Sequence, residues 1–160
     1  FEVLLSSKTK AMKLTLAHYY KLIEESFLSR DILYRLSKVS KSVDLKNFFF
    51  EQAQKRELYA VELKTALSYN YSLENFSSVF AKMILKNKFR KSILATFLNR
   101  SDKALVNAFN ELFIADINIY GKIIMDTKEE ISFYKMLINQ HSDLRDALKS
   151  SMTLIPKVAA

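Results

Sequence analysis

Apolar residues recur along most of the chain at steps of three and four positions, the spacing that gathers side chains on one face of an α-helix. The pattern predicts four long helices, at about residues 8–38, 45–68, 102–125 and 128–150. In the first of them, for example, Ile23 and Phe27 belong to the apolar stripe. The chain is therefore expected to be all-α.

Polar residues that favour helix starts precede three of the predicted helices. Asp44 follows a serine-rich break and is the expected N-cap of the second helix, and Ser101 precedes the third. Thr127 and Glu130 have the spacing of a capping box, in which each side chain bonds the other residue's backbone amide. The last residues, which include the single proline, Pro156, are expected to fray after the fourth helix.

The unequal lengths of the connections predict the topology. Only a few residues join the first helix to the second and the third to the fourth, so each pair is expected to form an antiparallel hairpin. About thirty residues separate the hairpins, and their apolar pattern predicts a partly helical crossover at about residues 77–98. Two hairpins joined by one long crossover make a ferritin-like, up-and-down four-helix bundle. We expect a single domain over residues 1–160.

The composition agrees with this fold and excludes several classes of protein. One glycine and one proline in 160 residues leave too few turns for a many-stranded sandwich or barrel. They also leave no glycine-rich loop for a nucleotide phosphate. The absence of cysteine excludes disulfides, thiolate metal sites and a cysteine nucleophile.

Two segments of the second predicted helix carry a resemblance to a known family. Residues 44–49 and 54–63 resemble the motifs Leu-Lys-x-x-Phe and Gln-x-Arg-x-x-Phe-x-x-Glu-Leu of a bacterial ferritin-like family described only as a domain of unknown function. Tyr120, Leu137 and Gln140 are also similar to its pattern. The resemblance covers about residues 12–150 and implies a four-helix bundle, without an established activity. Phe113 stands where the family usually has an acidic residue.

The histidines do not fit the di-iron site of ferritin-like bundles. That site needs Glu-x-x-His on two helices, because residues three apart face the same metals. His141 follows Ile138 at this spacing, His18 follows Thr15, and Glu51 is followed by a glutamine. No standard di-iron site, and no cofactor, is expected.

Four polar residues are expected at similar heights near the middle of the bundle. They are Glu24, Arg56, Asp116 and His141, one from each predicted helix. We interpret them first as a buried polar layer, in which an arginine fork pairs with a carboxylate and sets the register of the helices. The alternative is an altered metal site that uses Glu24, Asp116 and His141. The serines Ser26, Ser29 and Ser142 are interpreted as ordinary surface residues of helices.

The predicted crossover carries most of the excess positive charge. Residues 77–100 hold six basic and no acidic residues, in a chain with a formal net charge of +8. The expected basic surface consists of Lys82, Lys86, Lys88, Arg90 and Lys91. Such a segment can bind an anionic membrane surface or an acidic helix, or simply keep its lysines in water. Nucleic acid fits less well, because no helix-turn-helix spacing or aromatic platform accompanies the charge.

These observations lead to two hypotheses of function. The first is a non-catalytic binding or structural protein, with a second copy or a helical protein as partner. The second is a divergent metal-binding oxidoreductase, with Glu51, Glu57 or Glu111 as further ligands. A cytoplasmic location is expected, since no apolar run reaches the length of a membrane span and Glu2 is atypical of a signal peptide. Because the chain starts at Phe1, we interpret its first residue as a trimmed end.

Overall fold

The computed structural model describes residues 2–70, 100–127 and 131–159, and the side chains of residues 16–68, 100–127 and 134–154. The helices of this part are α1 (Glu2–Val39), α2 (Val43–Asn70), α4 (Asp102–Asp126) and α5 (Ile131–Ala159). No strand occurs among the described residues. Over the described residues, the prediction of an all-helical fold with four long helices is thus confirmed. The predicted crossover and its five basic residues lie outside the described part.

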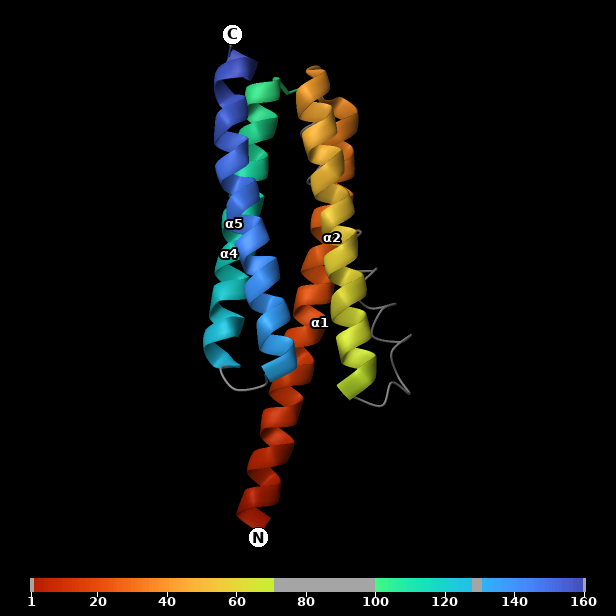
Figure 1. The fold of residues 1–160 in the computed structure, drawn as a ribbon, viewed down its shortest axis with the longest axis vertical. Coiled ribbons are helices and arrows are strands. Elements are labelled where there is room, and N and C mark those ends of the chain that lie inside the picture. The colour runs from red at the N-terminus through yellow and green to blue at the C-terminus, as the bar shows by residue number, and fades with distance from the viewer. Residues whose placement is uncertain (1, 71–99, 128–130, 160) are drawn as a thin grey trace.

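Each helix packs beside two others, and all neighbouring helices run antiparallel (Figure 1). α1 and α2 form one hairpin, and α4 and α5 form the other. Between the hairpins, α1 contacts α4 through Ser29 and Asp116, and at the C-terminal end of α4 through His18 and Asp126. α2 contacts α5 where Tyr59 bonds Asp143. α2 and α4 therefore stand diagonally across the bundle, which decides how their side chains meet inside it.

An aromatic cluster fills the upper half of the core between α2 and α4. Phe49, Phe109 and Phe113 are fully buried, with 4.1 Å between the ring centroids of Phe109 and Phe113. Phe48 packs against Phe109 at the edge of the cluster, with 5.1 Å between the centroids. Phe50 turns outward and is 46% exposed. The run of three phenylalanines thus spans the boundary between core and surface, as its helical spacing requires.

The turn between α1 and α2 is fastened to the start of α4. The Asp102 carboxylate accepts hydrogen bonds from the backbone amides of Lys41 and Ser42, each at 2.8 Å. Ser101 is the N-cap of α4, as predicted, and its hydroxyl accepts from the amide of Ala104. The prediction that Asp44 caps α2 is wrong, because the helix begins at Val43, two residues earlier than predicted, and the Ser42 hydroxyl accepts a hydrogen bond from the amide of Leu45.

Two expectations about α5 are corrected. Thr127 does not start this helix, since its hydroxyl donates to the carbonyl of Ile123 and closes α4. The helix begins at Ile131 and continues through Pro156 to Ala159, where fraying was expected. Proline lacks an amide hydrogen and so withholds one hydrogen bond from the preceding turn, and the helix continues past it for only three residues.

The N-terminal part of α1 extends beyond the other described helices, at the end of the bundle that lies away from the turn between α1 and α2 (Figure 1). It starts at Glu2, earlier than the expected residue 8. None of the described helices combines the length and apolar content needed to cross a membrane.

Candidate functional site

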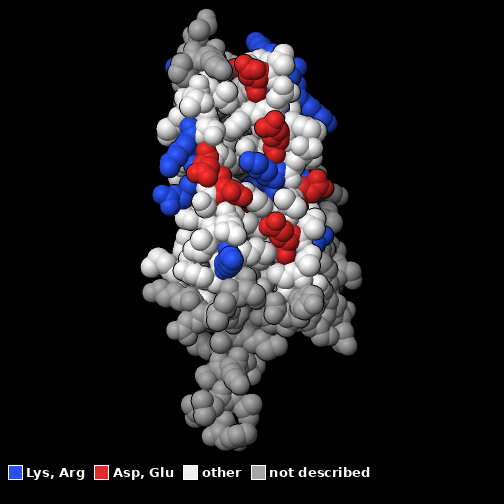
Figure 2. All heavy atoms as spheres, in the orientation of Figure 1, with Lys and Arg blue, Asp and Glu red and all other residues white. Residues whose placement is uncertain are grey.

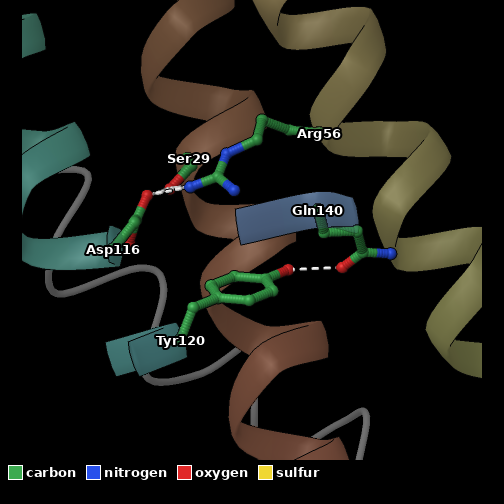
Figure 3. A network of polar contacts seen from close by, with 5 residues as sticks. All are labelled: Ser29, Arg56, Asp116, Tyr120 and Gln140. Atoms are coloured by element: carbon green, nitrogen blue, oxygen red, sulfur yellow. Dashed lines mark hydrogen bonds and ion pairs between the residues drawn. The ribbon is translucent and has the colours of Figure 1, made fainter. Parts of the chain in front are cut away.

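A buried ion pair joins the two diagonal helices at mid-height (Figure 3). Arg56 of α2 is 1% exposed and Asp116 of α4 is 2% exposed. Nη2 of Arg56 donates to Oδ2 of Asp116. The hydroxyl of Ser29, on α1, donates to the same oxygen at 2.8 Å and accepts from Nη2 at 3.3 Å. Three helices are thereby held in one polar contact across the middle of the bundle.

Aromatic rings surround the guanidinium group of Arg56. Its Cζ lies 5.2 Å from the ring centroid of Phe113 and 5.7 Å from that of Tyr59, within range of a cation–π contact. Burial lowers the pKa of Arg56, while the nearby groups of Tyr120 and Tyr59 raise it. Among the described residues, Nε and Nη1 of Arg56 have no hydrogen-bond partner. The charge is therefore held mainly by one carboxylate and by ring faces.

A second buried network continues from Tyr120 on α4 to α5 and α2. The Tyr120 hydroxyl donates to Oε1 of Gln140 at 2.6 Å, as Figure 3 shows. The Gln140 amide donates in turn to Oε2 of Glu62 at 2.8 Å. Burial raises the pKa of Tyr120 to about 12, so the phenol is a donor at neutral pH. The network leads from the core to a carboxylate near the surface between α2 and α5.

Tyr59 makes a parallel link between the same two helices. Its ring is buried, and its hydroxyl donates to Oδ2 of Asp143 at 3.2 Å. Burial, and next to it the Asp143 charge, raises the pKa of the phenol. Glu62 and Asp143, two carboxylates at the contact between α2 and α5, therefore each accept a hydrogen bond from a buried side chain.

The structure brings together two of the four residues expected in the polar layer. Arg56 and Asp116 form the ion pair, but Glu24 is only half-buried and is not part of it. The neighbouring Glu25 is the buried glutamate of α1, and its carboxylate pairs with Lys21 at 2.8 Å. The step from one residue to the next turns a helical side chain by about 100°, so the prediction chose the wrong one of two adjacent glutamates.

His141 lies apart from the ion pair, at the contact between α4 and α5. It is half-buried, and one of its ring nitrogens lies 3.9 Å from where a Cβ on Gly121 would stand. Burial lowers its pKa, and Arg145 lowers it further. The backbone of Ile117 opposes this shift through a hydrogen bond. His141 therefore packs between the helices of one hairpin instead of joining the central layer.

The other residues considered for chemistry lie mainly on the surface. Glu51, Glu57 and Glu111 are exposed. Among the side chains that the structure describes, no cluster of three or more histidine, aspartate or glutamate residues is placed to hold a metal ion. The central polar layer, for which the sequence left a metal site or an ion pair open, thus holds the guanidinium of Arg56 and the carboxylate of Asp116.

The interpretation of two serines as surface residues is wrong. Ser26 and Ser29 are fully buried, although they were interpreted as surface residues, while Ser142 is exposed. Their spacing contained the signal that could have found them, because positions 22, 26, 29, 33 and 36 form one helical stripe whose other members are leucines. Gln140 likewise stands in a stripe of buried residues between Leu137 and Leu144. Ser29 and Gln140 make buried hydrogen bonds, whereas the hydroxyl of Ser26 has no hydrogen-bond partner among the described residues.

The chain matches no family model, and neither a curated protein nor a solved structure is significantly similar to it.

Proposed function

We propose that this protein is a ferritin-like four-helix bundle with a structural or binding role, and not an enzyme that works through a metal centre. The observation that carries the proposal is the buried pair of Arg56 and Asp116. Arginine keeps its proton in proteins, so the guanidinium is a permanent positive charge beside the carboxylate. A metal ion would have to displace it or be repelled by it at short range in a medium of low dielectric constant.

The antiparallel neighbours support the ferritin-like part of the proposal. The end of α2 and the start of α4 lie at opposite ends of the bundle (Figure 1), so the connection between the hairpins has to traverse its length. Bundles of that connectivity place metal ligands on facing helices at mid-height. In this chain the corresponding height is taken by an ion pair and by hydrogen bonds between side chains.

The alternative, a divergent metal-binding oxidoreductase, needs Asp116 to be free for a metal together with Glu24 and His141. Asp116 instead accepts hydrogen bonds from Arg56 and Ser29. No observation on the described residues favours this alternative. The predicted contacts of the basic residues with a membrane or an acidic helix stay predictions, because residues 77–98 lie outside the described part.

A metal-binding experiment tests the proposal. The protein is purified without chelators, dialysed against iron(II) and manganese(II), and analysed for bound metal by mass spectrometry. We expect far less than one ion per chain and no rise in the thermal unfolding midpoint, since a ligand of the native state would raise it. One tightly bound ion per chain that is lost in the Asp116→Asn variant would overturn the proposal.

A further inference from the structure

A cavity of about 350 Å³ opens between α2 and α5, outside the Arg56–Asp116 pair. It lies in the size range of small-molecule sites, which begins at about 300 Å³. α2 contributes Leu58, Tyr59 and Glu62, and α5 contributes Lys135, Met136, Asn139, Gln140 and Asp143. Figure 2 shows acidic side chains, interspersed with lysine and arginine side chains, on the face that α2 and α5 present to the viewer.

Two carboxylates in this cavity are held in place from the inside. Gln140 donates to Oε2 of Glu62, and Tyr59 donates to Oδ2 of Asp143. The second oxygen of each carboxylate, Glu62 Oε1 and Asp143 Oδ1, has no hydrogen-bond donor among the described residues. A carboxylate accepts up to about four hydrogen bonds, so both groups retain unused acceptor positions.

The remaining lining includes one cation, Lys135, and two large apolar side chains, Leu58 and Met136. Lys135 forms no ion pair with Glu62 or Asp143 within the described structure, and one lysine against two carboxylates leaves the lining with a formal charge of −1. Leu58 is 54% exposed, and Met136, which lines the same cavity, is half-buried. An apolar group that covered these two side chains would remove hydrophobic surface from water.

We propose that this cavity binds a small organic cation, whose ammonium group lies between Glu62 and Asp143 and whose apolar body covers Leu58 and Met136. The chain as a whole carries a formal charge of +8 and does not attract cations at long range. Binding must therefore come from the local carboxylates and from apolar contact. This site goes beyond the proposed structural or binding role, and its test does not depend on the absence of metal.

Three probes of nearly equal size and different charge test the proposal. They are 2-phenylethylamine, the neutral 2-phenylethanol and the anionic 3-phenylpropionate, titrated into the chain of 160 residues and followed by nuclear magnetic resonance. We expect saturable shifts with the amine and at least about tenfold weaker binding of the other two, as the loss of a charge-assisted hydrogen bond produces. Equal binding of all three, or no saturable binding of the amine, would overturn the proposal.

Variants locate the site. Glu62→Gln and Asp143→Asn keep the shape of each side chain but remove its charge, and each is expected to weaken binding of the amine by about tenfold. Glu51→Gln is the matched control on the same helix, because Glu51 is exposed and does not line the cavity. Asp143 is exposed, so its variant should fold even if Glu62→Gln does not. Unchanged binding in the Asp143→Asn variant contradicts the proposal.

Discussion

At the scale of single residues, a charged side chain dominates the interior of this protein. Arg56 crosses the bundle to reach Asp116, and few other charged side chains are buried among the described residues. Taking such a pair out of water costs much of what the attraction returns, so the intact pair adds little net stability. Substitution of only one member of the pair is different, because the remaining charge is then buried without a partner and the free energy of unfolding falls. An arrangement of the helices that separated Arg56 from Asp116 would leave both charges buried without a partner.

The first prediction concerns this pair. Arg56→Met should lower the free energy of unfolding by about 3–5 kcal/mol, because it strands the Asp116 carboxylate in the core. The double variant with Asp116→Leu should recover a large part of the loss. Urea unfolding measures both, and Lys55→Met, at an exposed neighbouring position, serves as control. A single variant as stable as the control would mean that the pair does not control stability.

The second prediction concerns pH. The pKa of His141 is lowered in the folded state from its ordinary value of 6.5, mainly by burial. At pH values between the folded and the unfolded pKa of His141, the unfolded chain binds more protons than the folded chain. The contribution of His141 to the free energy of unfolding therefore decreases as the pH drops below 6.5. His141→Gln should reduce this slope. Urea midpoints measured at several pH values test it, with His18→Gln as the comparison. An identical slope in wild type and the His141 variant would contradict the prediction.

At the scale of elements, the two hairpins are joined by side-chain contacts at different heights. The ion pair holds α1, α2 and α4 together, and the network of Tyr120, Gln140 and Glu62 holds α4, α5 and α2. At the upper end, Asp102 binds the turn between α1 and α2. Since hydrogen bonds are directional, these contacts set the register of the hairpins more sharply than apolar packing alone.

The contact at the turn gives the third prediction. Asp102→Ala should lower the free energy of unfolding by about 1–3 kcal/mol, because two charge-assisted hydrogen bonds to backbone amides are lost. The exposed neighbour Lys103→Ala is the control and should stay close to wild type. Hydrogen exchange of the Lys41 and Ser42 amides provides a second measurement, with faster exchange expected in the Asp102 variant. Unchanged exchange at both amides would show that Asp102 does not hold the turn.

At the scale of the whole molecule, the antiparallel neighbours define which ends of the helices meet. The turn at Lys41 lies beside the start of α4, and the end of α4 approaches α1 where His18 faces Asp126. α4 has 25 residues, so its two ends are about 37 Å apart at 1.5 Å per residue. Distances between labelled sites can therefore distinguish this arrangement from one in which the second hairpin is inverted.

The fourth prediction uses the absence of cysteine in the chain. Spin labels attached after Lys41→Cys and Lys103→Cys should lie close together. Labels attached after Lys41→Cys and Met125→Cys should lie farther apart by about 25–30 Å, since these positions are at opposite ends of the bundle. All three side chains are exposed, so the labels should not disturb the core. Electron paramagnetic resonance measures both distances, and a reversed order would refute the arrangement of the hairpins.

The sequence alone determined the helices. Steps of three and four between apolar residues recur over long segments, and with one glycine and one proline little else interrupts them. The bounds of α4 were predicted to within a residue, because Ser101 is a clear N-cap. The end of α5 was not, because a proline usually indicates the end of a helix in a sequence, whereas this helix continues past Pro156 to Ala159.

Only the tertiary structure decided which polar side chains meet. The sequence singled out Arg56 and Asp116, since each interrupts an apolar stripe, but it could not separate Glu24 from Glu25 or place Ser29 between the pair. Periodicity fixes the direction of a side chain only to within part of a turn, whereas a hydrogen bond requires a position within a few tenths of an ångström. That accuracy comes from the packing of all four helices, which also forms the cavity between α2 and α5.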